Sequence, residues 1–340
     1  MKNLYTAIIT ILIVIFNIVI ILSPADILIA AREGLTLWGN NVLPSLLPFV
    51  FGINVLLGLG VLGFIGAILA PVMKLFNVPG IGGFPLIVGF TSGYPIGAKV
   101  VSQLREEQQL TKTQAERLIS FCNNSGPLFI LGAVGIGMFN SESVGYFILS
   151  IHYGAALITG LIFRYYKHKE THLALTPGTT ISLKAAYTQM NDNKEKNFGK
   201  LLTDSIHASV QTMLVIGGFI IAFNVILEVI TTINLIENLG EVLAGLTNMA
   251  SLSFDLHVFT GVAYGVIEVA NGARHLTELG NFTRPVILAT ACIISFGGLS
   301  IHGQAISFLS KTDISIRTYL VSKLIHAGVT LILGLLFFPF

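Results

Sequence analysis

The sequence predicts an all-α polytopic membrane protein, and three observations support this fold class. Of the 340 residues, 53% are hydrophobic and only 11% are charged, far more apolar than a soluble domain of this size needs. Several apolar runs approach the roughly 20 residues that a helix needs to cross a bilayer. Other apolar stretches are broken in the middle by glycine, proline or polar residues, as in transporters whose helices unwind at membrane depth.

The apolar runs give seven candidate membrane-spanning helices. They cover residues 4–22, 36–59, 115–139, 144–166, 203–232, 283–308 and 315–338. The first run is longer than the about 7–15-residue core of a signal peptide, so we expect it to remain as a helix. The stretches 60–76 and 235–252 are apolar but carry Gly or Asn, which predicts short, tilted or interfacial helices. Residues 167–200 are polar and rich in lysine, so we expect them to link two halves of the chain.

Residues 80–102 and 254–279 differ from the candidate spans because glycines or prolines break both of them in the middle. Each holds a cation, Lys99 or Arg274, in apolar surroundings. An arm of about ten helical residues reaches about 15 Å, which is half the thickness of the hydrocarbon layer. We therefore predict two re-entrant hairpins, with one poor spanning helix in each place as the alternative.

The two halves of the chain share short motifs at a constant offset. Gly97–Lys99 returns 175 residues later as Gly272–Arg274, and the pair Ser120–Phe121 returns at the same offset as Ser295–Phe296. If the hairpins do not cross the bilayer, each half crosses an odd number of times, so the second half is inverted relative to the first. The sequence therefore predicts an inverted repeat, as in many secondary transporters.

The distribution of basic residues favours this topology with a cytoplasmic N-terminus. Of the nineteen Lys and Arg residues, only Arg32, Arg274 and Arg284 would then lie on the outer side. Lys311, Arg317 and Lys323 are counted here as lying at or toward the cytoplasmic side. The predicted divisions are a first transmembrane helix with an outer loop (1–34), a first repeat (35–166), a basic cytoplasmic linker (167–202) and a second repeat (203–340).

Polar breaks are predicted in two corresponding helices, within SFCNNSGP (120–127) and SFGGLSIH (295–302). Pro127 lacks an amide donor and is expected to clash with the preceding turn, while Gly126 loosens the backbone. The polar side chains at these breaks can face a ligand, or they can satisfy the freed backbone groups. They are Asn123, Asn124 and Ser125 in the first break, and Ser300, His302 and Gln304 in or just after the second.

The two hairpins supply the other candidate binding residues. Ionisable groups at membrane depth are costly, so Lys99 and Arg274 are candidates for function. Inverted symmetry would bring them together at the midplane, where two cations favour an anion and the Arg fork suits a carboxylate. Alternatively, both cations snorkel to the surfaces. Glu268 can pair with Arg274 or take up H⁺ or Na⁺. The hairpins also offer Thr91, Ser92 and Asn271 as hydrogen-bonding groups.

Several classes of function are not expected. The chain shows no P-loop, no dinucleotide-binding fingerprint, and no hydrolase or zinc-protease motif, so we expect neither an enzyme nor a cofactor. No cluster of His, Asp or Glu has metal-ligand spacing along the sequence, so no metal site is expected. Net charge is close to zero, which argues against nucleic acid as a partner. Cys122 and Cys292 are expected to be small buried hydrophobic residues.

Three stretches carry a family resemblance, and they read WGNNVLPSLLPF (38–49), GFTSGYPIGAK (89–99) and FCNNSGPLFILGAVG (121–135). They resemble the YlbJ/SpoVV-type sporulation integral membrane proteins of the Gate, or nucleoside-recognition, group. The resemblance runs from about residue 35 to residue 338. It implies a bacterial inner-membrane protein with two Gate repeats and a fold like that of the concentrative nucleoside transporters. It also implies dipicolinate, a small aromatic dicarboxylate, as the substrate of the sporulation members.

The expected function is therefore secondary or facilitative transport of a small organic anion, such as an aromatic dicarboxylate, bound at the midplane between the hairpins. One alternative is a transporter of nucleosides or other neutral polar solutes. Another is a scaffold or gate for a partner complex that transports nothing itself. The expected partners are the lipid bilayer, the anionic substrate and a coupling H⁺ or Na⁺. A homo-oligomer is a further alternative, because the glycine-rich stretch 58–66 can pack against another subunit or inside the monomer.

Overall fold

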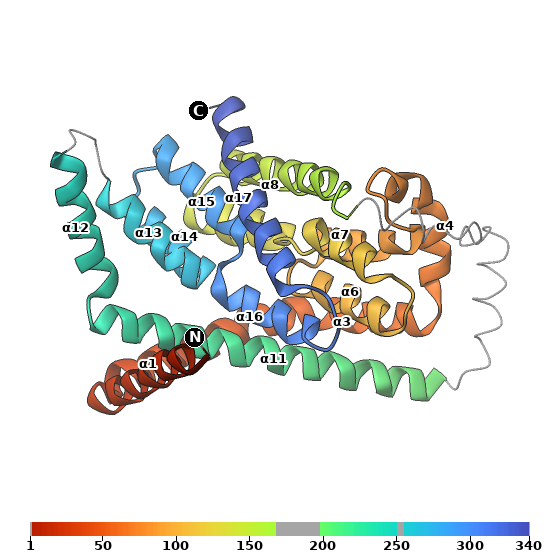
Figure 1. Cartoon of the computed structure of the whole chain (residues 1–340), viewed down its shortest axis with the longest axis horizontal. Helices are drawn as coiled ribbons and strands as arrows, with labels where there is room; N and C mark the ends of the chain where they lie inside the picture. Colours follow the sequence, from red (N-terminus) through yellow and green to blue (C-terminus); the bar gives the residue numbers. More distant parts are fainter. Residues whose placement is uncertain (1, 168–197, 250–254, 340) are drawn as a thin grey trace.

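The computed structural model describes residues 2–167, 198–249 and 255–339, and these residues form helices and connecting turns without a strand (Figure 1). The all-helical prediction is confirmed. Most of the predicted linker, 167–202, lies outside the described residues.

The first half begins with two long helical runs. Its elements are α1 (Lys2–Leu22), α2 (Pro24–Leu37), the π-helical segment η1 (Trp38–Val42), α3 (Leu43–Gly58) and α4 (Val61–Lys74). Helical backbone therefore extends well before the predicted span 36–59. Pro24 stands in the first turn of α2, where its missing N–H is harmless. Gly60, with φ +77°, separates α3 from α4, and this left-handed conformation favours glycine.

Shorter elements complete the first half. They are the 3₁₀ turn η2 (Gly80–Gly82), α5 (Gly83–Thr91), α6 (Ile96–Glu106), α7 (Lys112–Cys122), the π-helical η3 (Leu128–Met138) and α8 (Glu142–Phe163). Thr111 caps α7 in a reciprocal capping box with Gln114. The predicted span 115–139 is thus split into α7 and η3, as the polar residues at its centre predicted.

The second half repeats this order of elements. It contains α11 (Phe198–Thr232), α12 (Leu235–Met249), α13 (Leu256–Ile267), α14 (Val269–Thr277), α15 (Arg284–Phe296), α16 (Gly298–Leu309) and α17 (Ile316–Leu336). In each half a long helix and a second helix precede a pair of short helices. A broken helix and a final helix then follow. The last helices of the two halves, α8 and α17, pack against each other.

Among the described residues, four helices are long and apolar enough to cross a membrane, judged by length and composition. They span Glu142–Phe163, Phe198–Thr232, Arg284–Leu309 and Ile316–Leu336. Two bent pairs would raise the number to six if each counts as one span. The bend is 102° between Thr6–Leu22 and Pro24–Asn40, and 94° between Leu43–Gly58 and Val61–Lys74. Such a set of apolar helices is compatible with a polytopic membrane protein.

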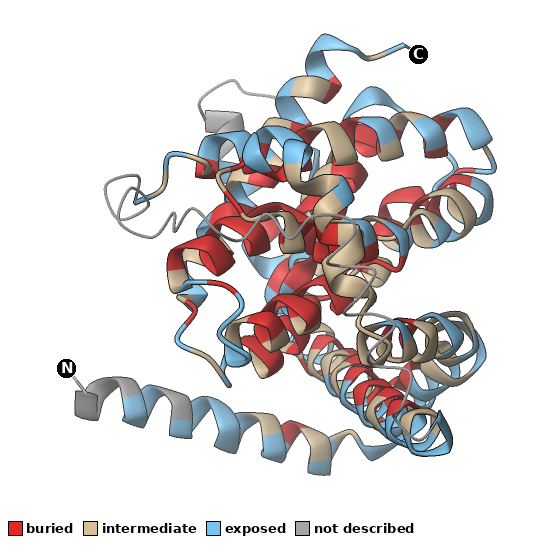
Figure 2. Cartoon of the chain, turned by 90° about the vertical axis from the view of Figure 1, so that its right-hand side faces the viewer, coloured by how far each residue is buried: buried red, intermediate tan, exposed pale blue. Residues whose placement is uncertain are grey.

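Buried residues gather in the middle of the molecule, whereas α1 and the outer faces of the long helices are exposed (Figure 2). Large apolar side chains such as Ile11 and Leu12 of α1 are more than half exposed. A lipid environment suits such a surface, because patches of this kind are uncommon on soluble monomers. In the glycine-rich stretch, Gly58 faces Leu201 and Gly66 faces the backbone of Ile81, so these two glycines pack inside the chain.

Candidate functional site

The first break lies between α7 and η3, and the second lies between α15 and α16. α7 ends at Cys122, and helical backbone resumes at Pro127. Pro127 therefore stands at the start of the following helix, where a missing N–H is tolerated, and is not pressed against the preceding turn as predicted. Gly297 and Gly298 make the second break with φ values of +99° and +70°. Such angles are strained for any residue with a Cβ atom.

Each half contains a pair of short helices joined by a turn, α5–α6 in the first half and α13–α14 in the second. This turn packs against the break in the same half. A Cβ atom added to Gly93, in the turn between α5 and α6, would lie 2.5 Å from the amide nitrogen of Gly126. The backbone N–H of Tyr94 also donates to the carbonyl oxygen of Asn124 at 2.6 Å. In the second half, a Cβ atom added to Gly298 would lie 2.9 Å from the carbonyl oxygen of Gly265. The contacts are made by backbone, so no side chain separates turn from break.

His152 of α8 connects the two breaks. Its Nε2 accepts a hydrogen bond from the backbone N–H of Ser125 at 3.1 Å, and its Nδ1 lies 2.7 Å from the hydroxyl of Ser295. Because Nε2 accepts, Nδ1 carries the proton and donates to Ser295. The hydroxyls of Ser295 and Thr330 are 2.8 Å apart, and Thr330 donates to the carbonyl oxygen of His326 at 2.9 Å. One ordered chain of hydrogen bonds therefore joins both halves.

Tyr319 of α17 makes a second connection between the breaks. Its hydroxyl accepts from the side-chain amide of Asn123 at 3.0 Å and lies 3.2 Å from Nδ1 of His302. Because the Tyr319 hydroxyl accepts from Asn123, its own hydrogen can be donated to Nδ1 of His302. The proton of the neutral imidazole then lies on Nε2. This Nε2 is buried and has no hydrogen-bond partner among the described residues. It is thus a buried donor without an acceptor among the described residues.

Lys323 lies beside these connections, although its side chain is only 2% exposed. Its Nζ donates to the carbonyl oxygen of Asn123 and lies 6.0 Å from the centre of the Tyr319 ring. In the part of the chain that the structure describes, no carboxylate forms an ion pair with Lys323. A buried lysine is uncommon without a counter-charge. Lys323 is therefore enclosed within the protein, inside the predicted span 315–338.

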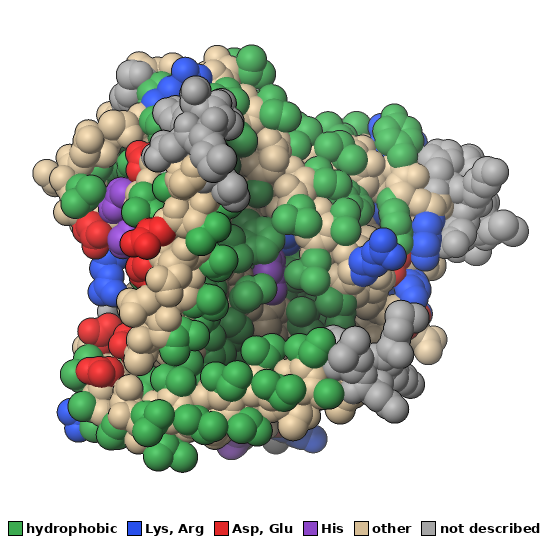
Figure 3. Space-filling view, turned by 60° about the vertical axis from the view of Figure 1, so that its left-hand side comes forward, with side chains coloured by type: hydrophobic (Ala, Val, Ile, Leu, Met, Phe, Trp, Pro, Cys, Tyr) green, Lys and Arg blue, Asp and Glu red, His purple; other side chains and the backbone are tan. Residues whose placement is uncertain are grey.

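Further buried polar atoms near the breaks also lack partners among the described residues. They include Oδ1 of Asn124 and Oγ of Ser92, while the Ser125 hydroxyl lies close to that of Tyr94. Buried polar atoms are nearly always hydrogen-bonded, so several unsatisfied ones in one region mark a candidate ligand site. One face of the molecule is hollowed and lined mainly by hydrophobic side chains, with a histidine visible inside (Figure 3).

The predicted residues of the breaks come together in this network. Asn123, Ser125 and His302 belong to it. The side-chain amide of Asn124 instead donates to the carbonyl oxygen of Phe121 at 2.6 Å, and its backbone carbonyl oxygen accepts from the backbone N–H of Tyr94. Ser300 and Gln304 are buried in α16 and hydrogen-bond to each other at 3.4 Å.

The predicted hairpin residues have partners of their own. Lys99 donates to Oδ1 of Asn54 at 3.1 Å, and the exposed Arg274 donates to Oδ1 of Asn271 at 3.0 Å. Thr91 is exposed and bonds back to the carbonyl oxygen of Ile87. The two predicted cations thus have different neighbours, and no contact between them is found among the described residues.

Glu268 occupies the turn of the second short helix pair and caps α14. Its Oε2 accepts from the backbone N–H of Asn271 at 2.8 Å. The side-chain amide of Asn271 donates onward to Asn224 of α11 at 3.1 Å. The first contact satisfies a backbone N–H group of the turn, and the second joins α14 to α11.

Sequence reasoning missed the residues that α8 and α17 contribute. A signal was present in α17, because Tyr319, Lys323, His326 and Thr330 follow one another at spacings of four, three and four residues. This spacing places polar side chains on one face of an otherwise apolar helix. A second group was hidden by distance along the chain: His257, His275 and Glu278 lie close enough together to hold a metal ion.

Comparisons with known proteins agree with an integral membrane protein. The Gate family model, described as nucleoside recognition, matches residues 40–142, from η1 to the start of α8. Sporulation integral membrane protein YlbJ of Bacillus subtilis (strain 168) is 36% identical over 304 residues, covering 87% of this chain and 74% of that protein. No solved structure matches.

Proposed function

Because the chain belongs to the family of the sporulation integral membrane protein YlbJ, we propose that this integral membrane protein is a secondary or facilitative transporter. Its substrate would be a small organic anion bound where the two helix breaks meet. This proposal includes an inverted relation between the two halves, short helix pairs that enter the membrane without crossing it, and a cytoplasmic N-terminus in a bacterial inner membrane.

The observation that carries the proposal is the buried ammonium group of Lys323 without a carboxylate partner among the described residues. Burial of an uncompensated charge is costly, and an anionic ligand would supply the missing counter-charge. The N–H of His302 Nε2 offers a donor in the same network. In addition, η3 and α16 both begin at the breaks, and helix N-termini carry partial positive charge.

The contact between turns and breaks supports a mechanism of alternating access. Gly93 and Gly298 bring the backbones of turn and break together without intervening side chains. Such contacts can separate and re-form without repacking of bulky groups, so the short helix pairs can move as units against the rest. No nucleotide-binding motif occurs in the chain, so transport would be driven by an ion gradient or run downhill. We assign the coupling ion, H⁺ or Na⁺, to the buried carboxylate of Glu268.

An aromatic dicarboxylate such as dipicolinate is the proposed substrate class. One carboxylate would pair with Lys323, while the aromatic ring would pack near the edge-to-face pair formed by Phe296 and His302, whose ring centres are 4.6 Å apart. A nucleoside is the second candidate, favoured by the description of the matching family model and by the free amide oxygen of Asn124. In both cases the amide groups of the first break would orient the ligand.

Flux of labelled compounds into proteoliposomes that contain the purified protein tests the proposal. We expect uptake of dipicolinate above that of protein-free vesicles, and inhibition by other small dicarboxylates but not by nucleosides. Uptake of uridine without uptake of dipicolinate would support the second candidate. Absence of flux together with absence of ligand-dependent thermal stabilisation would contradict transport and leave a scaffold or gate for a partner complex.

A further inference from the structure

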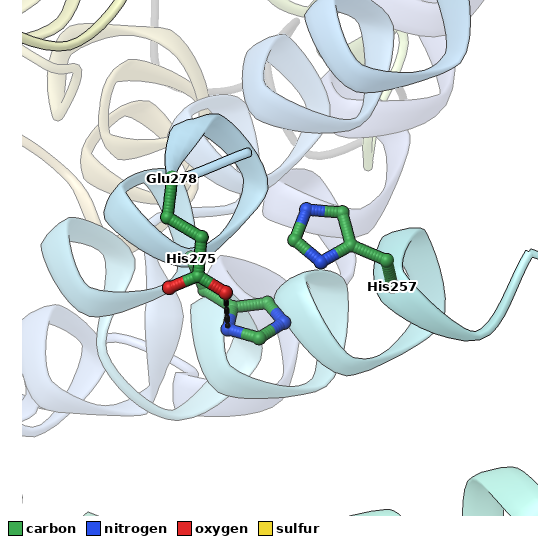
Figure 4. A group of neighbouring side chains, drawn as sticks. All are labelled: His257, His275 and Glu278. Atoms are coloured by element: carbon green, nitrogen blue, oxygen red, sulfur yellow. Dashed lines mark ion pairs between the residues drawn. The ribbon is translucent and has the colours of Figure 1, made fainter. Parts of the chain in front are cut away.

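The helix pair α13–α14 carries a cluster of metal-binding side chains at its open end, away from the turn at Glu268. His257 lies at the start of α13, while His275 and Glu278 lie at the end of α14 (Figure 4). Their ligand atoms all lie within 4.8 Å of one another. We infer that His257, His275 and Glu278 form a binding site for a divalent metal ion of the zinc class, which the proposed transport activity does not require.

The donor set suits this class of metal. Two imidazole nitrogens and one carboxylate oxygen are typical zinc ligands, and three protein ligands leave a position for water in a tetrahedral site. Nδ1 of His275 is 3.1 Å from Oε1 of Glu278, close to the ligand–ligand separation around a tetrahedral ion with bonds of about 2.0–2.1 Å. The imidazole rings of His257 and His275 have centres 4.6 Å apart, so small side-chain rotations would complete the set.

An ion pair between His275 and Glu278 is the simplest alternative, because these residues are three positions apart on one helix. It does not account for His257, which comes from the other helix and has a ring nitrogen within 4.8 Å of the ligand atoms of His275 and Glu278. The Nε2 atom of His257 lies 3.3 Å from the carbonyl oxygen of Leu276. The ion pair also does not account for the neighbouring acid, Glu237. Tyr264 packs edge-to-face against His275 and donates to Oε1 of Glu237 at 2.5 Å.

Glu237 completes the surroundings of the site. Its Oε2 is buried and has no hydrogen-bond partner among the described residues. Carboxylates behind ligating histidines commonly orient the rings and stabilise a bound cation. Glu237 belongs to α12, so the site and its support join three consecutive helices of the second half. A bound ion would fasten α13 to α14 at the end opposite their turn.

The test uses the full-length protein in detergent, stripped with a chelator, with Zn²⁺ alone as the probe. Competition against a chromogenic chelator is expected to give one ion per chain with Kd below about 10 µM. His257→Ala and Glu278→Gln are each expected to weaken binding at least about tenfold. His207→Ala removes an exposed histidine of α11 and is the matched control, with binding unchanged.

Thermal unfolding separates this site from adventitious binding and from misfolded variants. Zn²⁺ is expected to raise the unfolding temperature of the wild type and of His207→Ala, and to leave that of His257→Ala unchanged. Glu278→Gln alters an exposed side chain, so it is expected to unfold like the wild type when no metal is present. Equal Zn²⁺ affinity in the wild type and both cluster variants, or no binding by the wild type, would overturn the inference.

Discussion

Lys323 donates a hydrogen bond from Nζ to the backbone carbonyl oxygen of Asn123, the first residue beyond the end of α7. A broken helix leaves carbonyl oxygens without their usual partners, and here a cation from the second half satisfies one of them. The same residue provides the buried charge on which the proposed anion site depends. The break in the first half is therefore bonded directly to a cation of the second half.

The cations of the short helix pairs are expected to matter less for anion binding than Lys323. Lys99→Gln keeps a donor for Asn54, and Arg274→Gln changes an exposed residue. We predict that the double variant retains dipicolinate affinity within about threefold, because the exposed charge of Arg274 contributes little and Lys99 is bonded to Asn54. Isothermal titration of the purified variants measures this. A loss of binding in the double variant would instead favour an anion site formed by Lys99 and Arg274.

Removal of His152 should destabilise the fold. His152→Ala would leave the buried N–H of Ser125 without its partner, remove one of the two partners of the Ser295 hydroxyl and open a cavity, at a cost of about 2–5 kcal/mol in the free energy of unfolding. The unfolding temperature in detergent is the measurement, with His207→Ala on the exposed face of α11 as the control. Equal unfolding temperatures for both variants would show that the connection between the breaks does not stabilise the protein.

Gly93 is predicted to be intolerant of a side chain. Its φ is +81°, and an added Cβ atom would lie 2.5 Å from the amide nitrogen of Gly126. We expect Gly93→Ala to lower stability by about 1–3 kcal/mol through strain and displacement of the turn. Gly218→Ala is the matched control, because nothing lies within 4 Å of an added Cβ atom there. That helical control is expected to be neutral or slightly stabilising, and a similar result for Gly93→Ala would contradict the close packing of turn and break.

The loop between α16 and α17 should give a small pH dependence. Arg105 makes a bidentate pair with Asp313 at 2.8 and 3.0 Å, and its hydrogen bonds lower the pKa of the Asp313 carboxyl. A lowered pKa in the folded state means that the pair stabilises above the unfolded pKa of about 3.9, and that this contribution is lost as pH falls through the folded value. Because Asp313 is half-exposed, we expect the ion pair to contribute less than about 1 kcal/mol to the free energy of unfolding.

Comparison of the wild type with Asp313→Asn measures this contribution. The difference in unfolding temperature should be constant at neutral pH and should shrink below about pH 4. The difference should also shrink at high salt, which screens an exposed pair. A difference that grows on acidification would contradict the assignment.

The sequence predicted local features well, because composition and backbone chemistry determine them. The polar run at residues 123–126 and the two glycines at 297–298 interrupt helices where the prediction placed the breaks. The helix pairs around residues 93 and 268 were also recognised from their glycines and proline. Each of these features depends on residues that are close together along the chain.

Relations between distant residues were harder to predict. The span prediction placed Lys323 within residues 315–338, at or toward the cytoplasmic side, but it could not show that the side chain is buried. Its burial depends on α17 packing against α7 and α8. The ring centres of His152 and His326 are 4.7 Å apart, although the two residues are far apart along the chain. Only tertiary packing brings these groups to the breaks.

Titration of dipicolinate into purified Lys323→Gln tests most directly whether Lys323 holds the substrate anion. The glutamine retains a donor for the carbonyl oxygen of Asn123 but removes the charge. We predict that affinity falls at least about tenfold relative to the wild type, since charge-assisted hydrogen bonds contribute about 1.5–3 kcal/mol. Lys311→Gln, which removes an exposed lysine beyond α16, should bind like the wild type. Undiminished affinity in a folded Lys323→Gln protein would contradict the account.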